Sequence, residues 1–315
     1  MTMNTQHDLI AVVTGGAGFI GSHIADALLA RGYAVRILDD FSTGRRENIA
    51  HLRGRVEVIE GSVLDGRALA SAFAGADCVF HQAAIPSVPK SIRDPLASHE
   101  ANATGTLKVL LAARAASVRR TVIAGSSAYY GDTPTLPKRE DMPPAPLSPY
   151  GLQKYMAESY ALLFHKLFGL ETVVLRYFNV FGPRQDPDSE YSAVIPKFIR
   201  LYKRNEAPMI YGDGSTTRDF TFVSDVIDAN LLAATAPGVA GEVFNIAGGR
   251  QISLNDIARL IKTITNASVE PTYQPSREGD IMHSFADISK AEHMLGYRSA
   301  VGLEEGLRKT VDSIL

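Results

Sequence analysis

The sequence is poor in cysteine, and it lacks both a long apolar segment and a signal for export. Cys78 is the only cysteine among the 315 residues, so an internal disulfide is impossible. Its neighbours Val79 and Phe80 predict a small buried residue on a strand. No stretch approaches the roughly 20 apolar residues that span a bilayer, and the polar start from Met1 to Asp8 has no basic segment followed by an apolar one. We therefore expect a cytoplasmic protein without a membrane partner.

A large excess of charge of either sign is also absent. The formal net charge is -2 and the isoelectric point is near 6.5, so nothing attracts the whole chain to nucleic acid. The arginine pairs at 45–46 and 119–120 are too short to count as basic tracts. The eight histidines lack the paired spacing of metal ligands. We expect neither a nucleic-acid partner nor a metal site.

What the sequence does contain is an alternation of apolar runs and amphipathic stretches. The run from Leu9 to Thr14 ends in glycines and is followed by apolar residues at helical spacing, which predicts a strand, a tight turn and a helix. Similar runs predict strands at 34–38, 56–59, 78–80, 121–124 and 172–175. This order indicates an α/β fold with a doubly wound parallel sheet. We place the sheet-forming domain at 1–178 and a smaller α/β lobe at 179–315, with some segments returning to the first domain.

The segment 132–149 carries six prolines, at positions 134, 137, 143, 144, 146 and 149. Proline removes a backbone N–H donor and breaks regular helix. We therefore expect an ordered loop that ends where a helix begins near Tyr150.

The glycine-rich turn contains Gly15, Gly18 and Gly21. Glycines at these positions let the chain turn sharply, bring its backbone against a pyrophosphate and pack the following helix on the strand. The start of that helix supplies N–H donors and a positive dipole end for the phosphates. In isolation the motif is weak, because an ordinary strand-to-helix turn would explain it equally well.

An acidic residue follows at the expected distance. Asp39 ends the next predicted strand, 18 residues after Gly21, where a carboxylate would accept hydrogen bonds from the ribose hydroxyls of an adenosine. It would also repel a 2'-phosphate, which favours NAD over NADP, although Arg45 and Arg46 are close enough in sequence to offset that repulsion. Asp40 is as well explained by the start of a loop as by a cofactor contact.

Tyr150 and Lys154 lie one helical turn apart and can share one face of a helix. The ammonium group would then favour the ionised phenol and move its pKa from roughly 10 toward working pH. Ser126 follows an apolar strand and would lie at the carboxyl edge of the sheet, where its hydroxyl can hydrogen-bond a reacting oxygen. Ser127 is as well explained as a turn or capping residue.

These motifs together resemble the extended short-chain dehydrogenase/reductase superfamily, which has an NAD-binding Rossmann domain. The pattern comprises Thr14-Gly-x-x-Gly-x-x-Gly21, Asp39, Ser126, Tyr150-x-x-x-Lys154 and the segment 176–179. Within the superfamily the chain most resembles the UDP-hexose 4-epimerases, in particular members that accept UDP-N-acetylhexosamines. The match runs from about Ile10 to about Tyr297.

The resemblance implies a tightly bound NAD that takes hydride from C4 of a nucleotide sugar. Tyr150 would accept the proton of the 4-hydroxyl, and the resulting 4-keto sugar would turn in the pocket before hydride returns to its other face. Lys154 would hold the nicotinamide ribose and stabilise the phenolate, and Ser126 would bridge Tyr150 and the substrate oxygen.

The resemblance also implies two sets of binding residues. Those for the cofactor are Gly15, Gly18, Phe19, Ile20, Gly21, Asp39, Asp40, Ser42, Thr43, Gly44, Ser62, Val63, Gln82, Ala83, Ala84, Asn102, Ala124, Tyr150, Lys154 and Tyr177. Those for the UDP-sugar are Ser87, Ser126, Ser127, Tyr150, Asn179, Val194, Ile195, Tyr211, Arg218, Arg277, Asp280 and Ser284. Two arginines suit a diphosphate because guanidinium groups are permanently charged and bidentate. Core packing explains Val194, Ile195 and Tyr211 equally well.

Ser284 falls where epimerases restricted to glucose and galactose carry a bulky tyrosine. A small residue leaves room for a 2-acetamido group. We therefore hypothesise interconversion of UDP-N-acetylglucosamine and UDP-N-acetylgalactosamine, with UDP-glucose and UDP-galactose as further candidate substrates. A surface serine of no importance to the sugar is the alternative.

Other activities stay open at this point. Dehydratases of dTDP-sugars carry an acidic pair directly after the residue matched by Ser126, and related decarboxylases carry a glutamate where this chain has Ala128. A UDP-glucuronate epimerase and a non-catalytic NAD-sensing protein are further alternatives. Apolar residues beyond one face of the stretches 103–115 and 150–167 match helices that relatives pair into a four-helix contact, which predicts a homodimer.

Overall fold

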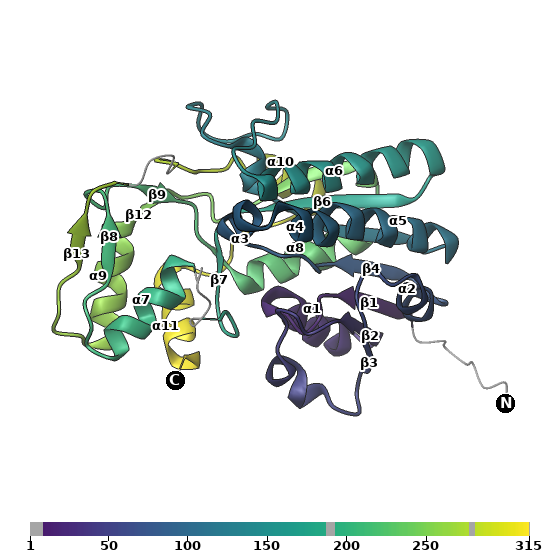
Figure 1. Ribbon diagram of the computed structural model, residues 1–315, viewed down its shortest axis with the longest axis horizontal. Helices are drawn as coiled ribbons and strands as arrows, with labels where there is room; N and C mark the ends of the chain where they lie inside the picture. The colour runs from purple at the N-terminus through teal and green to yellow at the C-terminus, as the bar shows by residue number, and fades with distance from the viewer. Residues whose placement is uncertain (1–8, 187–192, 277–280, 315) are drawn as a thin grey trace.

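A seven-stranded parallel sheet forms the centre of the protein, as the sequence predicts. The computed structural model describes residues 9–186, 193–276 and 281–314. The strands follow the order β11-β6-β5-β4-β1-β2-β3, with every neighbouring pair parallel (Figure 1). Their bounds are β1 Ile10–Thr14, β2 Ala34–Asp39, β3 Glu57–Glu60, β4 Cys78–His81, β5 Arg120–Ser126, β6 Glu171–Tyr177 and β11 Glu242–Ile246. The order reverses between β1 and β4, and ligands of such sheets bind at this switch point, beyond the carboxyl ends of the strands.

The edge strand β11 was not predicted from the sequence. It is short, it lies far from the other strands along the chain, and it pairs with β6 from Glu242↔Val173 to Ile246↔Tyr177. The connection from the lobe returns through helix α8, Val223–Thr235, which packs on β5 and β6. The second half of the chain therefore supplies part of the large sheet.

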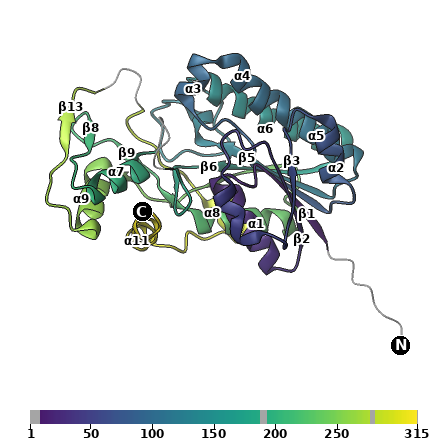
Figure 2. The same ribbon diagram turned by 60° about the horizontal axis from the view of Figure 1, so that its bottom comes forward.

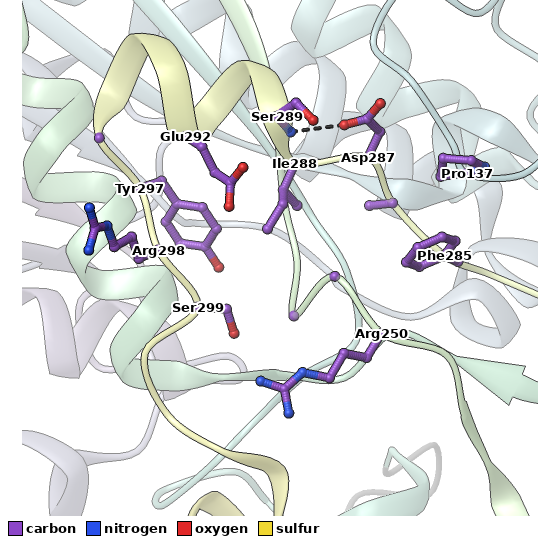
Figure 3. A pocket seen from close by; sticks show the side chains of 14 residues that line it. Pro137, Arg250, Phe285, Asp287, Ile288, Ser289, Glu292, Tyr297, Arg298 and Ser299 are labelled. Carbon is purple, nitrogen blue, oxygen red and sulfur yellow. Dashed lines mark hydrogen bonds between the residues drawn. The ribbon is translucent and has the colours of Figure 1, made fainter.

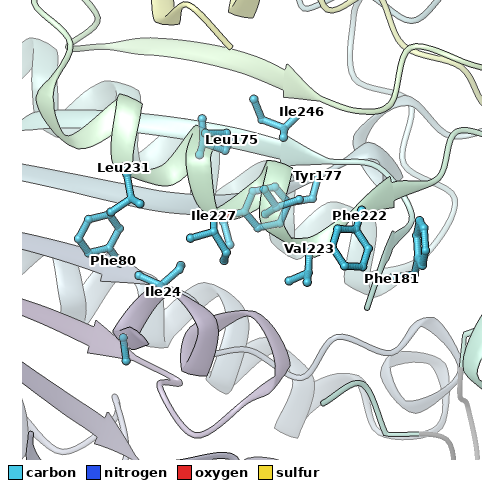
Figure 4. Close-up of a cluster of buried hydrophobic side chains, with 14 of the residues drawn as sticks. Ile24, Phe80, Leu175, Tyr177, Phe181, Phe222, Val223, Ile227, Leu231 and Ile246 are labelled. Atoms are coloured by element: carbon cyan, nitrogen blue, oxygen red, sulfur yellow. The ribbon is translucent and has the colours of Figure 1, made fainter. Parts of the chain in front are cut away.

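Helices cover both faces of the sheet (Figure 2). Helices α1, Phe19–Ala30, and α8 lie on one face, while α2, Gly66–Phe73, α5, Gly105–Ala115, and α6, Pro149–Phe168, lie on the other. Successive residues of β1 point to opposite faces: Val13 belongs to the cluster under α1 and α8, and Val12 to the cluster under α5 and α6. In Figure 4, Phe80 of the sheet packs against side chains of α1 and α8. This continuous apolar packing explains why the sheet strands read as unbroken apolar runs.

A smaller lobe lies beside the carboxyl edge of the sheet (Figure 1). It contains α7 Val194–Lys203, α9 Leu254–Thr265 and α11 Leu303–Ser313. The described residues after 178 also form three two-stranded sheets: β7 Val180–Phe181 with β10 Thr221–Phe222, β8 Met209–Tyr211 with β13 Thr272–Gln274, and β9 Thr217–Arg218 with β12 Ile252–Ser253. Helix α10, Ser289–Leu295, returns to β11, where Lys290 donates a hydrogen bond to the Val243 carbonyl. The division at residues 178 and 179 stays a prediction.

Short helices complete the chain before α6. They are η1 Arg46–Leu52, α3 Val88–Arg93, α4 Pro95–His99, η2 Glu100–Thr104 and η3 Ser127–Tyr130, of which η2 is a π-helical turn. None of the helices in the described ranges combines the length and apolarity needed to cross a membrane. Cys78 is buried on β4, as predicted, and burial raises the pKa of its thiol to about 12.

The start of α6 is defined by a capping serine and a proline. The Ser148 side chain accepts a hydrogen bond from the Gly151 N–H, and Pro149 occupies the first turn. Before it, residues 132–148 form neither helix nor strand, as the prolines predict. The buried pair of Arg176 and Glu158, with N–O distances of 2.6 and 2.8 Å, fixes the middle of α6 to β6. Tyr150 and Lys154 are therefore held on a rigid helix.

Candidate active site

The predicted catalytic residues meet at the carboxyl edge of the sheet. Ser126 is the last residue of β5, and Tyr177 is the last residue of the neighbouring strand β6. Tyr150 and Lys154 come from the first turns of α6, which packs against β5. The sheet and one helix thus bring together residues that are distant in sequence.

Lys154 is buried and bonded to the backbone of β5. Its Nζ donates a hydrogen bond of 2.9 Å to the Ala124 carbonyl, and only 9% of the residue is exposed. No acidic side chain of the described residues forms an ion pair with it. Because burial penalises the charged form, the pKa of Lys154 falls to about 8.

Tyr150 is half-buried and hydrogen-bonded to Ser126. Its backbone N–H donates to the Ser91 hydroxyl at 3.0 Å. Burial raises the pKa of the Tyr150 phenol above its usual value of 10, and a hydrogen bond with Ser126 acts in the opposite direction. The prediction that Lys154 moves this pKa toward working pH is not met, because burial outweighs the other causes. Burial thus favours the protonated phenol.

A directed chain of hydrogen bonds, which no sequence motif predicted, runs beneath the site. The Thr106 hydroxyl donates to the Asn102 carbonyl at 2.6 Å, so its oxygen accepts the Nε2–H of His81 at 2.9 Å. Nδ1 of His81 is then bare and accepts the Thr14 hydroxyl at 2.7 Å. Burial, and then the charge of Lys154, lower the pKa of His81 to about 3. A neutral imidazole of fixed tautomer thus joins the ends of β1 and β4 to α5.

The glycine turn has the geometry that a dinucleotide phosphate needs. Gly15 has φ +68°, and a Cβ there would lie 2.6 Å from the Ala83 nitrogen. A Cβ on Gly21 would lie 2.2 Å from the Gly15 carbonyl oxygen. No side chain caps the start of α1 at Gly18, which leaves the N–H groups of Phe19 and Ile20 suited to phosphate oxygens.

Asp39 lies at the end of β2, next to the glycine turn. Its two carboxylate oxygens accept N–H groups from Ala17 and Phe41, each at 2.8 Å, which fixes the carboxylate at the crevice. Arg46 pairs with Glu60 at 2.7 Å, and Arg45 pairs with Asp186 at 3.0 Å. Both guanidinium groups therefore lie in exposed ion pairs with carboxylates of this chain.

Other predicted cofactor residues have structural partners. Asp40 accepts the N–H and hydroxyl of Ser42, as a loop-start residue does. The Asn102 side chain accepts the Ile85 N–H at 2.8 Å. Gln82 and Asn230 both contact the Tyr177 hydroxyl, and burial raises the pKa of Tyr177 to about 12. These bonds hold Tyr177 in place at the edge of the sheet.

A cavity of about 240 Å³ brings together four of the predicted substrate residues, Asn179, Val194, Ile195 and Arg218. Five further lining residues were missed: Val180, Phe181, Ala193, Phe220 and Leu254. Their apolar character resembles ordinary core residues, so the sequence carried no signal for them. Cavities that hold small molecules are mostly apolar with a few polar groups, and this one fits that pattern.

The remaining predicted substrate residues lie outside this cavity. Ser87 caps α3, Ser127 begins η3, and Tyr211 ends β8. The Ser284 N–H donates to the Thr217 carbonyl at 3.2 Å, which places Ser284 beside β9. Arg277 and Asp280 are outside the described residues.

A second and larger cavity, of about 940 Å³, lies near α10 (Figure 3). It is lined by segments 248–250, 285–289 and 296–299 together with Pro137 and Glu292, and none of the predicted site residues borders it. Arg250 and Arg298 on its wall are accompanied by Glu292 and Asp287. This mixed charge selects no single class of ligand.

Comparison with known proteins gives a family and close relatives. The pattern of the NAD dependent epimerase/dehydratase family matches residues 11–247. UDP-glucose 4-epimerase of Mycolicibacterium smegmatis is 38% identical, over 96% of this chain and 97% of that protein. UDP-N-acetyl-alpha-D-glucosaminuronate decarboxylase of Bacillus cytotoxicus is 33% identical, over 95% of this chain and 96% of that protein.

A solved structure resembles the fold over nearly its whole length. UDP-N-acetylglucosamine 4-epimerase from Methanobrevibacter ruminantium, in complex with UDP-N-acetylmuramic acid, has a TM-score of 0.93 and 40% sequence identity. The similarity covers 97% of this chain and 98% of that one.

Replacing Lys154 by Met should stabilise the nucleotide-free protein at neutral pH. The folded pKa of about 8 lies below the usual 10.5, so the cost of burying the charge is present in full below pH 8 and disappears as the pH rises toward 10.5. We expect the free energy of unfolding in urea to increase by roughly 1–2 kcal/mol at pH 7, a value that already subtracts the lost hydrogen bond to the Ala124 carbonyl. This gain in stability should vanish near pH 10.

Lys166→Met provides the matched control for this prediction, because Lys166 is exposed on the same helix. It should leave the unfolding free energy nearly unchanged at both pH values. A Lys154→Met protein that is less stable than the wild type at pH 7 would contradict the argument.

Proposed function

Because the chain belongs to the NAD dependent epimerase/dehydratase family, we propose that it uses NAD to invert C4 of a UDP-sugar. The family is NAD dependent, and the glycine turn, the free start of α1 and Asp39 fit this cofactor. The observation that carries the proposal is the hydrogen-bonded pair of Tyr150 and Ser126 at the ligand edge of the sheet, with the buried Lys154 one helical turn along α6.

When bound, NAD supplies a hydride acceptor and a positive charge on its nicotinamide ring. Tyr150 Oη takes the proton of the sugar 4-hydroxyl and later returns it. Ser126 Oγ, which hydrogen-bonds the phenol, holds the sugar oxygen in line with it. Lys154 adds its charge in a site of low dielectric, where it acts more strongly than in water. These groups favour the ionised phenol that burial alone disfavours.

The cavity with Asn179 and Arg218 would hold part of the nucleotide. At about 240 Å³ it is smaller than typical ligand pockets of 300–1,000 Å³, so it would take the base and ribose rather than the whole UDP-sugar. Arg218 contacts the carbonyls of Thr217 and Met282, which fixes its guanidinium at the rim. There it would bind the diphosphate.

The substrate we propose is UDP-N-acetylglucosamine, with UDP-N-acetylgalactosamine as the product, and the plain hexoses as weaker substrates. Ser284 is small and half-buried in the segment paired with β9. The 40% identical M. ruminantium protein bears the name of a UDP-N-acetylglucosamine 4-epimerase, which supports the same choice.

Decarboxylation of a UDP-uronate is the second candidate, since a relative of 33% identity carries that activity in its name. Two features count against it. Positions 127 and 128 are Ser and Ala, so no carboxyl group follows Ser126, and the Ala128 N–H is bonded to the Ser126 hydroxyl.

Proton NMR of the purified protein with a panel of sugars tests the function directly. The panel contains UDP-N-acetylglucosamine, UDP-glucose, UDP-glucuronate and their thymidine counterparts. We expect the signals of the C4 epimer to appear with UDP-N-acetylglucosamine, without loss of a carbon. Carbon dioxide release from the uronate without C4 inversion of any sugar would refute the proposal.

Substitution of Ser284 by Tyr tests the sugar preference. A bulky ring should fill the space of the 2-acetamido group, so kcat/KM for UDP-N-acetylglucosamine should fall by about 10² while that for UDP-glucose changes by less than about threefold. Ser284→Ala is the matched control and should affect neither sugar by much. An equal loss on both sugars would refute the pocket-size argument.

We also propose that the protein is a homodimer through α5 and α6. Helix α6 exposes Leu152, Leu163 and Leu167, and α5 exposes Leu111, with exposed fractions between 48% and 64%. Three of these side chains recur at the spacing of one face of α6. Apolar surface of this kind is stabilised when a second copy covers it.

The double substitution Leu163→Glu, Leu167→Glu should give a monomer by light scattering at micromolar concentration. The wild type should have twice the mass of one chain. Met209→Glu, on the lobe, replaces a similarly exposed apolar residue and should leave the dimer intact. A wild-type monomer under these conditions would contradict the proposal.

A further inference from the structure

Asp219 is a buried carboxylate that lies outside the reacting groups. It follows Arg218 directly in the chain and has no exposed surface. Its Oδ1 accepts the Gly248 N–H at 2.8 Å, and its Oδ2 accepts the Ala286 N–H at 3.2 Å. Two backbone donors from separate segments thus converge on one side chain.

The two segments have different places in the fold. Residues 248–250 follow β11, the edge strand of the large sheet, whereas Ala286 belongs to the segment that carries Ser284. Asp219 itself lies between β9 and β10 of the lobe. One carboxylate therefore joins the sheet, the strand with Arg218 and the segment with Ser284.

Neighbouring backbone bonds make the segment 282–287 dependent on this junction. The Thr217 N–H donates to the Met282 carbonyl at 3.0 Å, and the Ser284 N–H returns to the Thr217 carbonyl. On the other side, Lys138 exchanges backbone hydrogen bonds with residues 285 and 287. The segment therefore lies as a single extended chain between β9 and the proline-rich loop. Two side chains bind its backbone: Asp219 accepts the Ala286 N–H, and Asn245 of β11 donates to the Asp287 carbonyl at 3.3 Å.

The close packing at Gly248 shows how tightly the junction is built. A Cβ at this position would lie 2.6 Å from the Phe220 carbonyl oxygen and 3.1 Å from Asp219 Oδ1. Both contacts are with groups that cannot move freely. Any side chain there would push the 248–250 segment away from the carboxylate.

We propose that Asp219 is a positioning residue for substrate binding, which sets the distance between the diphosphate-binding Arg218 and the sugar-flanking Ser284. This inference rests on the proposed function. The carboxylate touches neither cofactor nor sugar and acts through the two segments it holds. It therefore affects how tightly the UDP-sugar is bound, and how sharply its 2-substituent is read, more than the rate of the chemical step.

The test is Asp219→Asn, in which one oxygen becomes an N–H₂ donor that faces a backbone N–H donor. We expect KM for UDP-N-acetylglucosamine and the Kd for UDP to rise about tenfold or more, with kcat within about threefold of the wild type. The effect of Ser284→Tyr on sugar preference should also shrink in the double variant, because the two positions are coupled. NAD content reports that the sheet domain has folded.

Asp225→Asn is the matched control. Asp225 is equally buried and accepts hydrogen bonds from Ser299 and Val301, but it lies on α8 and borders neither Arg218 nor Ser284. It should lower thermal stability without changing KM or the Kd for UDP. Gly248→Ala provides a second route to the same junction and should reproduce the changes in KM and Kd seen with Asp219→Asn.

The possible results distinguish a failure of the positioning role of Asp219 from a failure of the proposed epimerase function. Changes in KM and Kd for Asp219→Asn that merely equal those of Asp225→Asn would overturn the positioning role while the epimerase activity stands. If Asp219→Asn fails to fold, unchanged binding in Gly248→Ala overturns it instead. A wild type that neither binds nor converts any UDP-sugar would refute the proposed function itself.

Discussion

The site depends on a buried lysine ammonium group held by a carbonyl and not by a carboxylate. The Ala124 carbonyl that binds Lys154 lies two residues before the end of β5, and Ser126 ends that strand. An acidic partner would offset the positive charge that we propose acts on the Tyr150 phenol during the reaction. His81 beneath the site is neutral. A second cation there would repel the ammonium group of Lys154 and favour its loss of a proton. The arrangement costs stability and leaves a positive charge one helical turn from Tyr150, the proton acceptor that we propose.

The rest of the fold keeps these groups in place. Ser148 and Pro149 begin α6 at a fixed residue, and the buried pair of Arg176 and Glu158 fastens the helix to β6. The glycine turn brings its backbone close to Ala83, two residues after β4. The ends of the strands and the start of one helix therefore need little rearrangement to receive a dinucleotide. In the lobe, Asp219 holds two backbone segments together by accepting the N–H groups of Gly248 and Ala286.

Much of this was predictable from the sequence, for reasons that differ from one feature to the next. Continuous apolar runs predicted six strands of the sheet, and prolines predicted the loop before α6, because both depend on local chemistry. The spacing of Tyr150 and Lys154 was enough to place them on one helix. Strand β11 escaped prediction because its position depends on pairing with β6, and Phe220 and Leu254 resemble core residues. The predicted direction of the Tyr150 pKa shift was wrong, because no motif shows how strongly burial raises this pKa.

The phenol of Tyr150 is the proton acceptor on which the proposed reaction depends. Its most direct test is to measure C4 inversion by the Tyr150→Phe protein loaded with NAD. The substitution removes one oxygen and keeps the ring, so the UDP-sugar should still bind with an affinity close to that of the wild type. Without a group to accept the proton of the 4-hydroxyl, turnover followed by NMR should fall by about 10²–10⁴-fold. Inversion at the wild-type rate by this protein would contradict the central claim.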